Sequence, residues 1–129
     1  MSLMLLSLSV VSIAQEKKLS DAPARFRTFF STFRKALDRS DKAGVANMTR
    51  FPFTWGLDAG DEGKYTRTQF IRNFRRLFTD DPREVLAERN PSFGRDEDGT
   101  YYISTQDAAH LGFVKSGKTY KFVSYVVEP

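Results

Sequence analysis

Large apolar side chains recur every three to four residues in two segments of the chain, and this period predicts two amphipathic helices. The first helix is expected to begin at the cap signal Ser20–Pro23 and to end near Ser40. Its apolar stripe consists of Phe26, Phe29, Phe30, Phe33 and Leu37. The second is expected to begin at Thr66, where Gln69 completes a capping box. Its stripe consists of Phe70, Ile71, Phe74, Leu77 and Phe78. Shorter helices are predicted over residues 40–48 and from Pro82 to Glu88.

Between the long helices the period changes to two, in the stretch "TRFPFTWG" at residues 49–56. Phe51, Phe53 and Trp55 alternate with smaller residues, which predicts a strand with one apolar face. Pro52 cannot donate a ladder hydrogen bond, so the strand is placed at a sheet edge or at a bulge, with the edge preferred. Phe51 and Phe53 are assigned to packing, and Trp55 to the mouth of a cavity. The following "DAGDEG" is predicted to be a loop.

The last third of the chain is rich in β-formers. Three strands are predicted, "TYYIST", "AHLGFVK" and "TYKFVSYVVE", with Ser116-Gly117 as the hairpin turn between the last two. The order helix, short helix, strand, helix, short helix and three strands predicts an α+β domain. In it, the helices cover one face of a curved antiparallel sheet.

Length and composition predict one domain with a secretion signal. The 129 residues suit a single domain over residues 21–129, preceded by a polar lead at 15–20. Residues 1–14 are predicted to be the signal, because an apolar run with interleaved small residues extends from Leu3 to Ala14. The run ends in Ser12-Ile13-Ala14, which matches a signal-peptidase site. Cleavage near Ala14 would leave a periplasmic or secreted protein. No Lys or Arg precedes the apolar run, so a buried N-terminal helix or strand stays open as the alternative.

The chain contains no cysteine, and this excludes a lipid-anchoring thiol, disulfides and cysteine-based zinc or redox sites. We therefore expect no stable membrane anchor. The acidic loops "DAGDEG" and "DEDG" lack the spacing of known calcium loops, so no metal and no cofactor are predicted.

Two of these stretches, "FRTFFSTFRKALDRSDKAGVANMTRFPFTWG" and "YTRTQFIRNFRRLF", resemble a group of small exported bacterial domains without assigned activity. More broadly, the chain from about Phe26 to Val127 resembles the nuclear transport factor 2-like superfamily, a cone-shaped α+β roll also called cystatin-like. The resemblance implies a conical cavity between sheet and helices. It rests on core and cap residues, and no active-site motif of the superfamily's enzymes is matched, so it indicates a fold better than a function.

Few residues offer chemistry for such a cavity. Asp107 and His110 form the best pair, since a carboxylate can orient an imidazole for proton transfer. The alternative to a catalytic pair is that Asp107 is a turn residue and His110 an exposed side chain of a strand. Tyr101 and Tyr102 must point to opposite faces of their strand, so only one can face the cavity. Tyr101 joins Trp55 as a candidate ligand-binding residue.

The chain carries a net charge of +4 and a pI near 9.5, and basic residues concentrate between Lys64 and Arg83. Such a balance permits a polyanionic partner. However, Arg72, Arg75 and Arg76 lie off the apolar stripe and are predicted to form the solvent face of a helix. We therefore expect no nucleic-acid binding.

Three functions remain. The excess of aromatic over convergent polar groups favours a non-enzymatic domain that binds a small apolar or amphipathic ligand, or a protein partner. The second hypothesis is an acid–base enzyme of the isomerase or dehydratase type that uses Asp107 and His110 in the cone. The third is a structural module that forms a homodimer through its sheet.

Overall fold

The computed structural model describes residues 17–58, 60–78, 88–105 and 109–128. The predicted signal segment, most of the predicted helix from Pro82 and the candidate Asp107 lie outside these residues.

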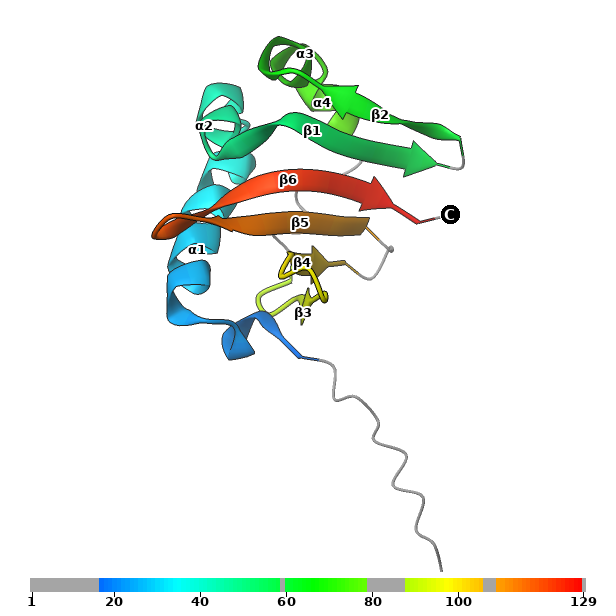
Figure 1. The fold of residues 1–129 in the computed structure, drawn as a ribbon. Coiled ribbons are helices and arrows are strands. Elements are labelled where there is room, and N and C mark those ends of the chain that lie inside the picture. The colour runs from blue at the N-terminus through cyan, green and yellow to red at the C-terminus, as the bar shows by residue number, and fades with distance from the viewer. Residues whose placement is uncertain (1–16, 59, 79–87, 106–108, 129) are drawn as a thin grey trace, which may run out of the picture.

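Within these residues a mixed, curved, open sheet of six strands forms one layer, and four α-helices pack against it (Figure 1). The strand order is β2-β1-β6-β5-β4-β3, in which only β1 and β6 are parallel. The elements are a 3₁₀ turn (Leu19–Asp21), α1 (Ala24–Asp38), α2 (Lys42–Asn47), β1 (Thr49–Asp58), β2 (Asp61–Tyr65), α3 (Arg67–Arg72), α4 (Phe74–Phe78), β3 (Ser92–Arg95), β4 (Tyr101–Ser104), β5 (Ala109–Ser116) and β6 (Thr119–Val127). The predicted α+β class is confirmed, but the prediction of an antiparallel sheet is wrong at one position, because β1 pairs in parallel with β6 and the sheet is therefore mixed.

Aromatic rings fill the space between α1 and the sheet. Phe26, Phe30 and Phe33 are fully buried along one side of α1. All three meet the ring of Phe113 on β5, with centroids 5.2–5.8 Å apart and planes nearly perpendicular. Edge-to-face pairs of this kind add to the free energy gained by burying their surface. The predicted stripe of the first helix is therefore the main contact between helix and sheet.

The prediction that residues 51–55 form an edge strand is wrong, because β1 lies between β2 and β6. Pro52 is tolerated there because it falls outside the regular pairing. The register with β6 shifts between Thr49 and Thr54, and pairing with β2 begins only at Phe53. The other predicted possibility, a bulge in the strand, is therefore the one that the structure shows at Pro52.

The predicted loop "DAGDEG" also needs correction, because its second half belongs to β2, an edge strand. Gly60 has φ +87°, a left-handed conformation that glycine adopts at little cost, and it allows the chain to reverse directly from β1. Polar residues suit β2 because one face of the strand is open to solvent, and the strand alternates between half-buried and exposed positions up to the buried Tyr65.

The predicted second long helix is divided at Asn73 into α3 and α4. Its capping box is confirmed, since Thr66 Oγ1 accepts from the Gln69 amide at 3.3 Å and Gln69 Oε1 accepts from the Thr66 amide at 2.9 Å. At the division the side chain of Asn73 donates to the Gln69 carbonyl at 2.8 Å. The Asn73 backbone amide donates to the same carbonyl at 2.9 Å, so Gln69 accepts two hydrogen bonds at the end of α3.

The three predicted C-terminal strands are confirmed as β4, β5 and β6. The hairpin turn between the last two consists of Gly117 and Lys118, one residue later than predicted, and Gly117 has φ +61°. A further strand, β3, was not predicted. Lys17 and Leu19, from the predicted polar lead, hydrogen-bond to the backbone of Phe93 and Pro91 at 2.8 and 2.9 Å.

Candidate functional site

A groove of about 570 Å³ lies between α1 and the turn that joins β5 to β6. Phe29 and Tyr120, both more than nine-tenths buried, supply its aromatic surface, and the half-buried Met48 adds a flexible apolar side chain. The lining residues are Ala24, Arg25, Thr28, Phe29, Thr32, Met48, Lys118, Thr119, Tyr120 and Lys121. The groove has the size of a small-molecule site.

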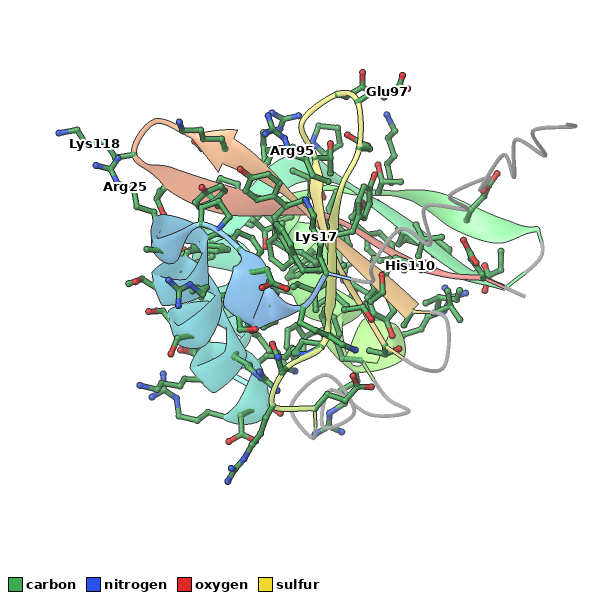
Figure 2. All side chains as sticks on the ribbon, turned by 90° about the horizontal axis from the view of Figure 1, so that it is seen from below. Lys17, Arg25, Arg95, Glu97, His110 and Lys118 are labelled. Atoms are coloured by element: carbon green, nitrogen blue, oxygen red, sulfur yellow. The ribbon has the colours of Figure 1, made fainter. Side chains whose placement is uncertain are left out.

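The charged residues that line this groove are all basic: Arg25, Lys118 and Lys121. Figure 2 shows Arg25 and Lys118 projecting at the same end of the molecule, from α1 and from the β5–β6 turn. Neither forms an ion pair with another described residue, whereas Lys121 Nζ donates to the Asn47 carbonyl at the end of α2 at 2.8 Å. The rim therefore offers two cations to an anion.

The other polar groups of the groove are hydroxyls. Thr28 Oγ1 donates to the Ala24 carbonyl at 3.1 Å, and Thr32 Oγ1 donates to the Thr28 carbonyl at 3.4 Å, so both protons are used within α1. Burial, followed by the neighbouring Tyr101, raises the pKa of Tyr120, although Arg25 opposes this shift. Tyr120 therefore stays neutral at physiological pH and adds no negative charge to the groove.

His110 lies on the opposite face of the sheet from the helices, where it pairs across the strands with Ser104. Successive side chains of a strand point to opposite faces, and the next residue, Leu111, is fully buried in the core together with its strand partner Ile103. His110 must therefore point to the outer face. Ser104 Oγ lies 2.6 Å from His110 Nδ1. On the other side of the ring, His110 Nε2 lies 3.3 Å from Glu128 Oε1, without the alignment of a hydrogen bond.

A site that uses His110 would thus lie on the outer face of the sheet and not between sheet and helices. The predicted partner Asp107 lies outside the described residues, and the neighbours found here are Ser104 and Glu128. Neither neighbour was predicted from the sequence. The register of the β4–β5 pair would have revealed Ser104, since residues 104 and 110 flank the connection at equal distance from its middle.

Trp55 is only 8% exposed, at the end of the core where β1 and β2 meet α4. Its ring stacks on Tyr65 with centroids 5.1 Å apart, and the Arg76 guanidinium carbon lies 5.0 Å from its centroid. Arg76 also forms an ion pair with Asp61 at 2.7 Å, and this hydrogen bond raises the pKa of Arg76. Arg76, predicted only as a solvent-face residue, therefore also covers Trp55. The Trp55 Nε1 atom is buried without a partner among the described residues. The cavity-mouth role of Trp55 stays a prediction.

Tyr101 and Tyr102 point to opposite faces of β4, as predicted. Tyr101 faces α1, edge-on to Phe26 with centroids 5.2 Å apart. Tyr102 is on the outer face, where its hydroxyl donates to Asp96 Oδ2 at 3.2 Å. Burial and then this carboxylate raise the pKa of Tyr102. Tyr101 lies beside Tyr120, 5.4 Å between centroids, and so backs the groove without lining it.

Over residues 17–58, 60–78, 88–105 and 109–128, no three His, Cys, Asp or Glu side chains gather in a way that could hold a metal ion. In the same part of the chain no helix is long and apolar enough to cross a membrane.

No family model and no curated protein matches the sequence. Among solved structures, the fold is similar to that of Aln2 from a Streptomyces species, at 13% sequence identity and a TM-score of 0.49. The similarity covers 78% of this chain and 85% of Aln2.

Proposed function

We propose that this chain is a small exported binding domain of the nuclear transport factor 2-like type, and that it holds an amphipathic anion in the groove between α1 and β6. The observation that carries the proposal is the pairing of an aromatic floor with an all-basic set of charged lining residues. Export is supported by the sequence of residues 1–14 alone, and the superfamily by the resemblance of the helical stripes and by the α+β architecture.

The floor selects for an apolar body. Phe29, Met48 and Tyr120 present carbon surface to the groove, and each square ångström of apolar ligand surface removed from water there stabilises the complex by about 25 cal/mol. Met48 can adjust its rotamer to ligands of different shape. The groove is therefore suited to a short alkyl chain or a small ring.

The rim selects for the sign of the head group. An anion bound beside Arg25 and Lys118 is attracted by both side chains, whereas a cation is repelled. The described residues that line the groove include no carboxylate to oppose the anion. Since no histidine or carboxylate that could take a proton is among the described lining residues, the composition of the groove suits binding better than acid–base catalysis.

The test compares two ligands that differ in the charge of the head group. Isothermal titration calorimetry with monomeric decyl phosphate and with decyltrimethylammonium should show tighter binding of the phosphate. The double variant Arg25→Gln/Lys118→Gln should weaken decyl phosphate binding by about 2- to 30-fold, because each exposed charge pair contributes about 0.2–1 kcal/mol.

The matched control is Arg72→Gln/Lys115→Gln, which removes the same charge from exposed residues that do not line the groove. Its binding should equal that of the wild type. Equal affinity for both ligands, or an equal loss in the control, would show that the groove does not recognise an anion. A further variant, Thr28→Phe, should block binding of either tail, because Thr28 is an exposed residue whose enlarged side chain would occupy the groove.

A further inference from the structure

The outer face of the sheet carries a serine, an imidazole and a carboxylate in line. Ser104 Oγ is 2.6 Å from His110 Nδ1, and His110 Nε2 is 3.3 Å from Glu128 Oε1. The three residues come from β4, from β5 and from the residue after the end of β6. In Figure 2 His110 lies far from Arg25 and Lys118, so this cluster is separate from the groove.

The two strands hold the first pair in place. Ser104 and His110 are direct partners in the antiparallel ladder, and the chain beyond them is tied by the Thr105 amide donating to the Ala109 carbonyl at 2.9 Å. The imidazole side chain is 28% exposed, so reagents can reach it, while its Nε2 atom is buried beside Glu128. Glu128 is 65% exposed and the most loosely held of the three.

We propose that Ser104 is a nucleophile toward small acyl groups on good leaving groups, such as aryl esters or thioesters, with His110 as its base. The tautomer that fits carries its proton on Nε2, facing Glu128, and leaves the Nδ1 lone pair to accept from the Ser104 hydroxyl. Glu128 is then a positioning residue whose negative charge, 3.3 Å from Nε2, favours this tautomer and stabilises the imidazolium.

The step balances without a cofactor. The bond from Ser104 Oγ to the acyl carbon forms while the hydroxyl proton moves to His110 Nδ1, and the bond from the acyl carbon to the leaving oxygen or sulfur breaks. The imidazolium returns its proton to the leaving group. Water then cleaves the acyl–serine ester with His110 again as base, so the products are an acid and an alcohol or thiol.

The location limits the substrates. Along β4 and β5 the paired backbone amides face each other within the sheet, so they do not point at an acyl oxygen held above Ser104. Without such donors the developing oxyanion gains little stabilisation, and the leaving group must supply the driving force. Val126, the neighbour of His110 on β6, offers apolar contact to a small acyl chain.

The experiment treats the full chain with p-nitrophenyl acetate, follows release of p-nitrophenolate, and maps the adduct by peptide mass spectrometry. The expected result is an acetyl ester on Ser104 that hydroxylamine removes. S104A should abolish this adduct and reduce nitrophenolate release at least about tenfold, as should H110Q, since positioned general bases contribute at least that much.

Ser124→Ala is the matched control, because Ser124 lies on the same face, opposite Gly112, and should leave the rate unchanged. E128Q should slow acetylation about 1.5- to 5-fold, the effect of losing one exposed charge pair. E128D should restore part of the rate, which a purely structural role of Glu128 would not predict.

Acetylation confined to lysine amines, which hydroxylamine does not reverse, would overturn the proposal. So would undiminished turnover in S104A, since His110 would then react by itself. The adduct on the wild-type protein decides the question even if a variant fails to fold.

Discussion

The two faces of the sheet use the same strands for opposite purposes. On the inner face Ile103, Leu111 and Phe113 are fully buried beneath α1 and pack against other apolar groups. On the outer face their neighbours Ser104 and His110 are partly exposed and bond to each other. Because successive residues of a strand point to opposite faces, the core side chains and the reactive side chains lie on different faces of the same strands.

This difference changes the meaning of the aromatic content. The number of phenylalanines in the sequence favoured ligand recognition, but in the structure these rings pack against one another. Phe122, for example, contacts the rings of five others: Phe33, Phe53, Phe70, Phe78 and Phe113. A ring that fills the core is not available to a ligand. The groove uses only two aromatic side chains, at the margin of the core.

The largest contrast between the faces should come from Phe122→Ala. Phe122 is fully buried, and its removal should lower the free energy of unfolding by about 3–5 kcal/mol through lost transfer free energy and a residual cavity. Ser124→Ala, nearby on the outer face, should change it by less than about 0.5 kcal/mol. Urea unfolding measures both. A cost below about 1 kcal/mol for Phe122→Ala would contradict the dense inner face.

A smaller contrast concerns two glycines. A methyl group at Gly63 would lie 3.1 Å from Cζ2 of Trp55, so Gly63→Ala should lower the free energy of unfolding by about 1–3 kcal/mol through overpacking. Gly94 in β3 has open space around the same position, and Gly94→Ala should raise it by about 0.5–1 kcal/mol by restricting the unfolded chain. Thermal unfolding of the two variants checks the difference, and equal shifts would show that Trp55 does not pack on Gly63.

The smallest effect concerns alkaline pH. The pKa values of Tyr120 on the inner face and Tyr102 on the outer face are both raised, each chiefly by burial. A raised pKa stabilises the folded state fully below the unfolded pKa of about 10, and this contribution is lost as pH rises through the folded pKa. The free energy of unfolding should therefore fall above about pH 10.

Single variants separate the two tyrosines. Tyr120→Phe and Tyr102→Phe should each make that fall less steep, as measured by urea unfolding across the alkaline range. Asp96→Asn should bring the pKa of Tyr102 down toward its ordinary value and leave Tyr120 unchanged in an ultraviolet titration of the phenols, since Asp96 bonds to Tyr102. A change at both tyrosines would mean that the faces are electrostatically linked.

The sequence was sufficient to predict the elements that a local signal specifies. The three-to-four-residue period defines α1, and the Thr66–Gln69 box marks the start of α3, because caps and amphipathic stripes depend on residues near in sequence. It failed for β2 and for the position of β1. A polar edge strand resembles a loop, and strand order depends on pairing between β1 and a segment about 70 residues later.

The candidate sites were harder to predict for the same reason. The groove joins the start of α1 to the β5–β6 turn, and the outer cluster joins Ser104, His110 and Glu128 from three different segments. Their proximity follows from register, in which a shift of one residue would move every side chain to the other face. His110 could be chosen from the sequence by its residue type, whereas Ser104 and Glu128 could be identified as its neighbours only from the pairing of the strands.

The central place of β6 also has a consequence for how the protein is made. β6 pairs with β1 on one side and with β5 on the other, so without it the sheet separates into β2–β1 and β5–β4–β3. A ribosome that has not yet released residues 119–127 holds a chain whose two parts have no strand to join them. Completion of the sheet must therefore wait until synthesis of the domain is almost finished, and until then the edges of β1 and β5 are open to chaperones.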